Sequence, residues 1–179
     1  MSHRIVFVVN ILIVLALIVF SIVVYSDLPD QIPTHIDYSG KADSTTEKNI
    51  FIWMAIPFLS VALLIVFSVI AGMIDKTPKW VNVPHKKLYL ALSENMRKAI
   101  NQYIKAYLLI TGFMVNVILF EVQLMLYQSA SNSEGKANIF NVYFLYFFAG
   151  VFLIYVFVYL FKFSQMIKTA WLAENPQGN

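Results

Sequence analysis

The chain has 179 residues, a net charge of +3, 59% hydrophobic residues, 13% charged residues and a mean hydropathy of +0.69. This composition is too apolar for an ordinary soluble domain, and the chain is too short for several domains. It has no cysteine, which excludes disulfide bonds and thiolate metal sites. We therefore expect one all-α integral membrane domain over residues 1–179.

Four apolar runs are each long enough to cross about 30 Å of hydrocarbon as a helix. They comprise residues 5–25, 50–73, 106–127 and 139–163. Arg4 precedes the first run as in a signal peptide, but the apolar core exceeds the about 15 residues of a typical signal. We therefore expect a retained helix. Aromatic residues suited to the membrane interface lie near the ends of the predicted helices: Tyr25, Trp53, Trp80, Tyr103, Tyr127 and Trp171.

Basic residues are distributed unevenly along the chain. Ten of the 13 lie before the first run, within residues 74–105, or from the end of the fourth run onward. The positive-inside rule therefore predicts that both termini and residues 74–105 are cytoplasmic. The pI of about 9.0 follows from this topology and from contact with the lipid bilayer, so we expect no nucleic-acid partner.

Residues 26–49 form a polar segment between the first two apolar runs, which we call the cap. It contains five acids and two lysines, a net charge of −3, and the predicted topology places it outside the cytoplasm. Pro29 and Pro33 restrict the local backbone to extended conformations. Gly40 occupies a turn position that favours positive φ. We expect an ordered extracytoplasmic loop.

The cap sequence allows two local structures. Residues 34–38 alternate in character and precede a turn signal, as in a hairpin. With a two-residue turn, His35 and Asp37 would share one face, and Ile36 would lie opposite Asp43 on the other. A proline-braced loop without strands is the alternative.

His35 lies among the cap carboxylates and has three open roles. It could sense pH, or bind a metal together with the acids Asp37, Asp43 or Glu47. Alternatively, His35 and Asp43 hydrogen-bond to the loop backbone. One imidazole with scattered carboxylates lacks the spacing of a metal site, so we expect no metal and no cofactor.

The cap sequence resembles a known family. The string Leu28-Pro29-Asp30-Gln31-Ile32-Pro33-Thr34-His35, followed by Gly40, Asp43 and Lys48, is similar to the pattern of the domain of unknown function 1648 (DUF1648). The later block "VNVPHKKLYLALSENMRKAINQYIKAYLL" resembles the segment that many members carry after the second helix. Its N-x-P-x-K positions are Asn82, Pro84 and Lys86.

The resemblance implies a protein of the bacterial cytoplasmic membrane. The best-known members are SdpI-type immunity proteins, which protect a cell from a secreted toxic peptide and can transmit its presence inward. This chain lacks the Asn and Gly-Tyr-Arg signature of their further membrane domain. It also has Ser44 to Glu47 where many members have an aromatic residue. The resemblance therefore implies the architecture, but neither the immunity role nor a particular ligand.

The cytoplasmic segment 74–105 combines a linker and a helix. Ser93 is a predicted N-cap with Glu94 in the first turn, and the residues that follow form an amphipathic extension of the third helix. This extension either lies against lipid headgroups or docks a cytoplasmic partner.

Polar residues inside a membrane helix are costly and therefore informative. Glu121 is the only ionisable residue within a predicted helix, about six residues from the outer end of the third helix, whereas Asn116 and Gln123 share another stripe of that helix. Asn10 is a candidate hydrogen-bonding neighbour. Glu121 is either a coupling or binding acid, or it hydrogen-bonds to the outer loop or a helix end. Pro57 predicts a kink in the second helix.

No nucleophile elbow, phosphate loop or zinc-protease motif is present in the sequence, so we do not expect an enzyme. Two function classes remain. The first is a binding or sensing protein of the immunity or accessory-subunit type, whose cap recognises an extracytoplasmic peptide or a membrane partner. The alternative is a small transporter, or a transporter subunit, that functions as a homo-oligomer and uses Glu121 as a coupling acid.

Overall fold

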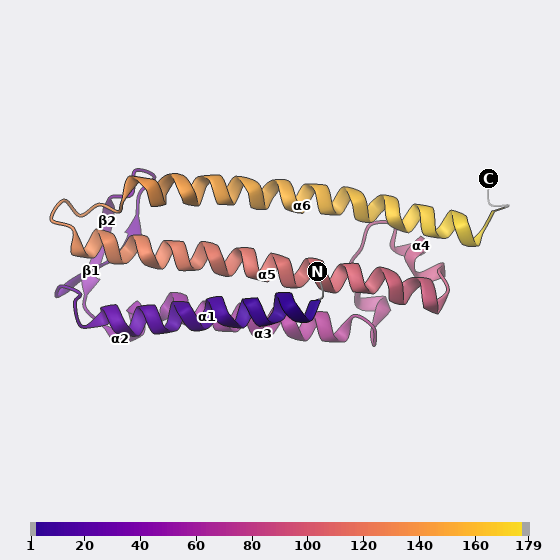
Figure 1. Cartoon of the computed structure of the whole chain (residues 1–179), viewed down its shortest axis with the longest axis horizontal. Coiled ribbons are helices and arrows are strands. Elements are labelled where there is room, and N and C mark those ends of the chain that lie inside the picture. The colour runs from indigo at the N-terminus through magenta and orange to yellow at the C-terminus, as the bar shows by residue number, and fades with distance from the viewer. Residues whose placement is uncertain (1–2, 177–179) are drawn as a thin grey trace.

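The computed structural model of the chain describes residues 3–176 as an elongated helical bundle with a small hairpin at one end (Figure 1). The elements in chain order are α1 (His3–Tyr25), β1 (Gln31–Ile36), β2 (Ala42–Glu47), α2 (Ile50–Trp53), α3 (Ala55–Met73), the 3-10 helix η1 (Pro78–Trp80), α4 (Lys86–Ala91), α5 (Glu94–Ser131) and α6 (Ile139–Glu174). Four of them, α1, α3, α5 and α6, are long and apolar enough to cross a membrane. The prediction of four spanning helices is therefore confirmed.

The two longest helices extend well beyond a bilayer. At 1.5 Å per residue, α5 and α6 are about 57 and 54 Å long, against about 30 Å of hydrocarbon. Their extra length projects past the end of α3 (Figure 1). We call this the α4 end and the opposite one the hairpin end. Ser93 caps α5 as predicted, because its hydroxyl accepts a hydrogen bond from the Met96 amide.

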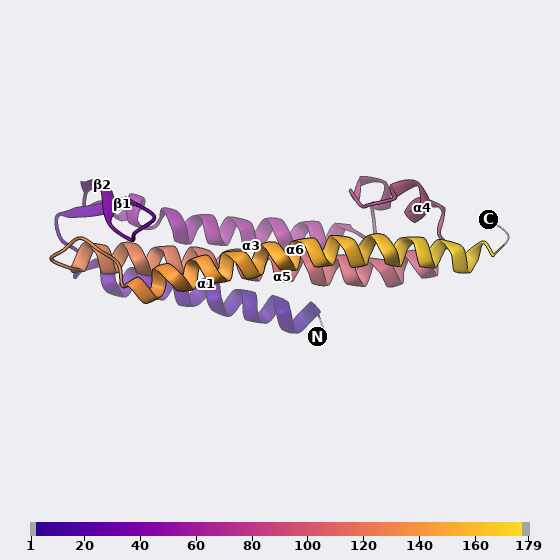
Figure 2. The same cartoon turned by 90° about the horizontal axis from the view of Figure 1, so that it is seen from above.

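Helix α5 is the centre of the bundle. It packs on α1 and α3 on one side and on α6 on the other (Figures 1 and 2). Buried polar side chains join α1, α3 and α5. Ser60 donates to Asn116 Oδ1 (2.8 Å), and Asn116 donates to Asn10 Oδ1 (3.2 Å). Asn10 in turn donates to the carbonyl of Leu109. The predicted role of Asn10 is confirmed, and this triad pairs polar groups that would otherwise be costly in a membrane.

The second apolar run is broken rather than smoothly kinked. The helix stops at Trp53 and restarts at Ala55, and Pro57 lies four residues after Trp53. Proline has no amide hydrogen for the carbonyl four residues earlier, so the Trp53 carbonyl needs another donor. Gln123 on α5 supplies it, at 3.3 Å. The structure thus has an interruption near Pro57 where we expected a kink within a continuous helix, and Gln123 compensates for the missing amide.

Trp53 is not an interfacial anchor, contrary to our expectation. Its side chain is 3% exposed, and its indole nitrogen donates to the carbonyl of Ser21 on α1 (2.8 Å). An indole buried with its N–H paired is a packing residue. Trp80 and Tyr103, by contrast, are exposed.

Aromatic stacking joins the middle of α6 to α5. The rings of Tyr107 and Tyr159 stack with centroids 4.0 Å apart, and Tyr155 stacks on Tyr107 at 5.7 Å. The Tyr159 hydroxyl donates to the carbonyl of Tyr103. The rest of this part of α6 presents apolar side chains outward, as expected for a helix that faces lipid.

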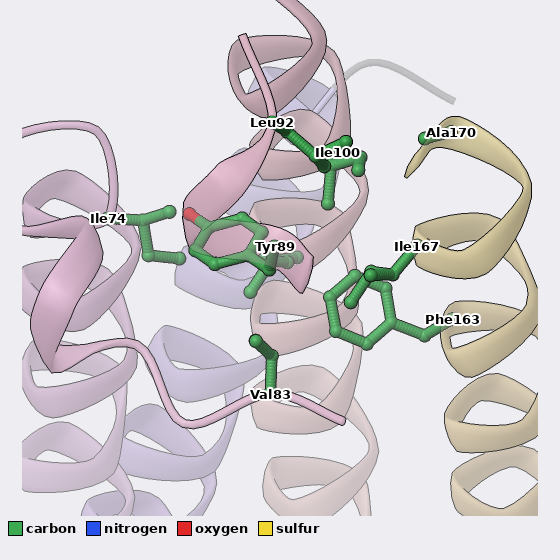
Figure 3. Packing of buried hydrophobic residues seen from close by; sticks show 9 residues of the cluster. Ile74, Val83, Tyr89, Leu92, Ile100, Phe163, Ile167 and Ala170 are labelled. Carbon is green, nitrogen blue, oxygen red and sulfur yellow. The ribbon is translucent and has the colours of Figure 1, made fainter. Parts of the chain in front are cut away.

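At the α4 end, the short helix α4 forms a bridge between the end of α3 and α6. Tyr89 is fully buried between Ile74, at the end of α3, and Phe163 and Ile167 of α6 (Figure 3). Neither α4 nor this cluster was predicted. A helix of six residues is too short to show a recognisable helical periodicity in the sequence.

Candidate functional site

The cap folds as a hairpin, which confirms one of the two predicted alternatives. Strands β1 and β2 pair antiparallel, with Ile36 opposite Ala42 and His35 opposite Ser44. The two-residue turn and its register, with Ile36 opposite Asp43, are wrong. A longer loop connects the strands, and the register shifts at His35, so that Asp43 has no partner across the ladder. The rest of residues 26–49 consists of connections to α1 and α2.

The bulge brings His35 and Asp43 together. His35 Nδ1 lies 2.5 Å from Asp43 Oδ1, and the two side chains are 67% and 47% exposed. The partner of each is therefore the other side chain rather than the loop backbone. Within residues 3–176 no group of three or more His, Cys, Asp or Glu side chains is placed to hold a metal ion.

The turn of the hairpin is closed by Asp37. One of its carboxylate oxygens accepts hydrogen bonds from the Ser39 amide and hydroxyl and from the Lys41 amide. The Ser39 hydroxyl and these amides hold the pKa of Asp37 below its usual value, because they stabilise the carboxylate. Gly40 then takes a φ of +84°, as predicted.

Gly40 also touches α6. A Cβ at this position would lie 2.7 Å from Val142 Cγ2, so no larger residue fits without movement. Beside it, the Gly40 carbonyl accepts from the Ala137 amide (2.8 Å), and the Ala42 amide donates to Gly135 (2.9 Å). These bonds join the cap to the loop between α5 and α6. The sequence contains no local signal for such pairing, because it depends on segments almost 100 residues apart.

The remaining predicted cap residues hold the hairpin in place. Lys48 Nζ donates to the Leu28 carbonyl (2.7 Å) and lies 5.0 Å from the centre of the Tyr25 ring, so it fastens the end of the cap to α1. Pro33 is buried in β1, whereas Pro29 is exposed. Lys48 thus has a structural role, whereas His35 and Asp43 lie on the exposed surface of the cap.

A cavity of about 470 Å³ lies beneath the hairpin, and we call it the hairpin cavity. The cap supplies one wall, and the three helices α3, α5 and α6 supply the others. Its lining is mostly apolar, with His35 and Asp37 among the few polar residues: Thr34, His35, Ile36, Asp37, Tyr38, Ile56, Val122, Met125, Leu126, Val142, Leu145 and Tyr146. Tyr146 also donates from its hydroxyl to the Tyr38 carbonyl (2.7 Å). Such a concave, largely apolar space with few polar groups is typical of a ligand site.

A smaller cavity of about 170 Å³ adjoins the hairpin cavity and shares Thr34, Ile56 and Leu126 with it. Pro33 and Gln123 both line this second space. Gln123 is fully buried, and its Oε1 has no hydrogen-bond partner within residues 3–176. A buried acceptor without a donor can bind an N–H or O–H group that enters the cavity. Gln123 Oε1 is therefore an available acceptor in this space, while Nε2 of the same side chain bonds to Trp53.

Comparison with known proteins identifies part of the chain. Residues 11–61 match the model of a family described as a domain of unknown function, DUF1648. This match confirms the predicted family, and it covers most of α1, the cap, α2 and the start of α3. No curated protein and no solved structure matches the chain.

Glu121 lies outside the DUF1648 region and outside the lining of both cavities. Its side chain is 9% exposed, and it makes no hydrogen bond or ion pair within residues 3–176. The expected bond to the outer loop or a helix end is therefore not present. By helical rotation of 100° per residue, Glu121 projects toward the side of α5 that carries Tyr107, whereas Asn116 projects toward α1 and α3. The three predicted intramembrane residues do not form one site.

The predicted residues of the cytoplasmic segment lie at the α4 end. Lys86 begins α4, Pro84 is half-buried before it, and Asn82 is exposed beside η1. Next to them, His85 takes a φ of +52°, and its Nε2 lies 2.9 Å from Ser164 Oγ on α6. No pattern in the sequence predicts this contact.

Proposed function

We propose that the protein is a binding or sensing protein of a bacterial cytoplasmic membrane, and that its DUF1648 cap recognises an extracytoplasmic peptide or a membrane partner. The hairpin cavity is the observation that supports this proposal. It joins the cap to α3, α5 and α6, so a bound group touches both the recognition loop and the helices that reach the other end.

The proposed orientation has the hairpin outside and both termini in the cytoplasm. The asymmetry of lysine and arginine supports it, because ten of the 13 basic residues lie at the α4 end or near the start of α1. In this orientation the long ends of α5 and α6 project into the cytoplasm. A change in the hairpin cavity can then alter contacts of α4 through two continuous helices.

Affinity purification from the native membrane, followed by mass spectrometry of retained molecules, tests the proposal. We expect a peptide or subunit in fixed ratio with the wild-type chain. Leu145→Trp fills the hairpin cavity, so this variant should no longer retain the peptide or subunit. Leu153→Trp lies on the exposed side of α6 and should retain it as the wild type does. Equal retention of the peptide or subunit by both variants would contradict the proposal. So would the absence of any retained molecule from the wild type and from both variants.

The exposed pair His35 and Asp43 offers a second variant at the same site. His35→Ala should cost below about 1 kcal/mol of stability, because an exposed pair contributes little. If the cap recognises the peptide or subunit, the variant should fold normally and bind that molecule more weakly. Loss of folding instead would indicate that the pair only seals the bundle.

Glu121 supports a second candidate function, a small oligomeric transporter with Glu121 as coupling acid. The supporting observation is that Glu121 is buried and has no partner within residues 3–176, which is costly in a membrane helix unless the group has a use. Asn116 is less suited to line a path, because Ser60 and Asn10 occupy its side chain. Glu121→Gln should abolish proton-dependent flux in reconstituted vesicles if this function is correct, and flux that survives the change would exclude it.

A further inference from the structure

A second apolar cavity lies at the α4 end, about 400 Å³ in volume, and we call it the α4-end cavity. The last turn of α3, the segment through η1 and one face of α5 line it, with Met73, Trp80 and Leu108 among the apolar residues. Asn82 and Thr77 are its polar lining residues. The cavity therefore lies where α3 leaves the predicted hydrocarbon layer.

This cavity opens to the outside of the helical bundle, because some of its lining residues are exposed. Trp80 is 85% exposed, and Met73 is 48% exposed on the outer side of α3. A large aromatic side chain exposed at the end of a spanning helix is typical of the headgroup level of a bilayer. An acyl chain can therefore reach the cavity from the side, without crossing the protein.

Unpaired lysines flank the same place. Lys76 and Lys79 lie in the segment that forms the rim, and Lys86 and Lys87 begin α4 shortly after it. None of the four takes part in an ion pair within residues 3–176. The nearby acid, Asp75, is already paired with Lys105 and accepts a hydrogen bond from Asn101. The net local charge available to a ligand is thus positive.

We propose that the α4-end cavity binds one anionic phospholipid, with an acyl chain between Met73 and Leu108 and the phosphate near Lys76 and Lys79. Charge complementarity selects this occupant, because an apolar space beneath unpaired cations matches an anionic headgroup on an apolar chain. Asn82 offers an amide to the same headgroup. This site is separate from the hairpin cavity and does not depend on the function proposed for it.

Native mass spectrometry of the delipidated full-length chain in neutral detergent tests the proposal. The probes are phosphatidylglycerol and phosphatidylcholine with the same acyl chains. We expect one phosphatidylglycerol to be retained in preference to phosphatidylcholine. The double variant Lys76→Gln/Lys79→Gln should weaken this binding about thirtyfold, since each basic residue near an anionic headgroup contributes a factor of about five.

Two further variants separate the site from bulk charge. Lys162→Gln/Lys168→Gln removes the same charge from α6 and should leave retention unchanged. Asn82→Trp obstructs the mouth of the cavity without removing charge and should also weaken binding. Equal retention of the two lipids, or equal losses in both lysine variants, would overturn the proposal. So would full competition by glycerol phosphate, which would indicate a site for a free anion, or retention of a protein through the same lysines in place of the lipid.

Discussion

The two ends of the bundle contain cavities of similar size, about 470 and 400 Å³, but they use their charged residues differently. At the hairpin end, Asp37 closes a turn, Asp43 pairs with His35, and Lys48 fastens the cap to α1. At the α4 end, Lys76 and Lys79 have no partner among the described residues. The hairpin end therefore offers a shaped apolar space, and the α4 end offers charge.

This difference indicates what each end can discriminate. A site whose polar groups are engaged selects a ligand chiefly by shape. In the smaller cavity that adjoins the hairpin cavity, Gln123 Oε1 can in addition accept one hydrogen bond. A site with unpaired lysines selects by charge and is sensitive to salt. Helices α3 and α5 both line the two cavities, so they are the elements through which one end can affect the other.

The largest expected effect on this arrangement comes from Gly40. Gly40→Ala adds a Cβ at positive φ and 2.7 Å from Val142, so we expect a loss of about 2–4 kcal/mol in unfolding free energy. Gly135→Ala is the matched control, because it also has positive φ but no atom within 4 Å, and it should cost about 1 kcal/mol. Chemical unfolding in mixed micelles measures both. Equal losses would mean that contact with α6 does not matter.

Gln123 gives the next largest effect. Gln123→Leu removes the side chain that donates to the Trp53 carbonyl and should cost about 1–3 kcal/mol. Pro57→Ala restores a backbone amide for that carbonyl, so the same change should cost less in that background. Unfolding of the two single variants and the double variant gives the coupling between them. A coupling of zero would contradict this account of the helix break.

At the α4 end, Tyr89→Phe tests the bridge. It removes the hydroxyl that donates to Asn101 Oδ1 (2.7 Å) but keeps the buried ring. We expect a loss of about 1 kcal/mol, because the amide oxygen of Asn101 then has no donor. Tyr103→Phe is a suitable comparison, since its ring is exposed. Thermal unfolding should show a clear decrease only for Tyr89→Phe.

The smallest expected effect is on the dependence of unfolding free energy on acidic pH. The hydrogen bond from Lys105 lowers the pKa of Asp75 below its usual value, because it stabilises the carboxylate. A lowered pKa means that this contribution is complete above about pH 4 and is lost as the pH falls through the folded-state pKa. Asp75→Asn should therefore reduce the decrease in stability below about pH 4, by less than about 1 kcal/mol. An unchanged acid profile would exclude the pair from this dependence.

Local signals in the sequence predicted local features well. Ser93 as an N-cap and Gly40 at positive φ each follow from the chemistry of one or two residues, and Pro57 marked an irregularity in the second helix, although as a kink and not as a break. The burial of Trp53 could not be predicted, because it depends on where the carbonyl of Ser21 lies in a neighbouring helix. The same holds for the pairing of Gly40 with Ala137 and for the bridge through Tyr89. The family was predicted from the cap, whereas the two cavities required the packing of helices distant in the chain.

Photocrosslinking from the hairpin cavity tests the central claim most directly. A photoreactive amino acid replaces Leu145 in the cavity or, as a control, Leu153 on the exposed side of α6, in cells with native expression. We predict a discrete adduct of one mass from position 145 alone, and its loss when Ile56→Trp narrows the cavity. Only heterogeneous lipid adducts from both positions would contradict the claim that this cavity binds a specific ligand.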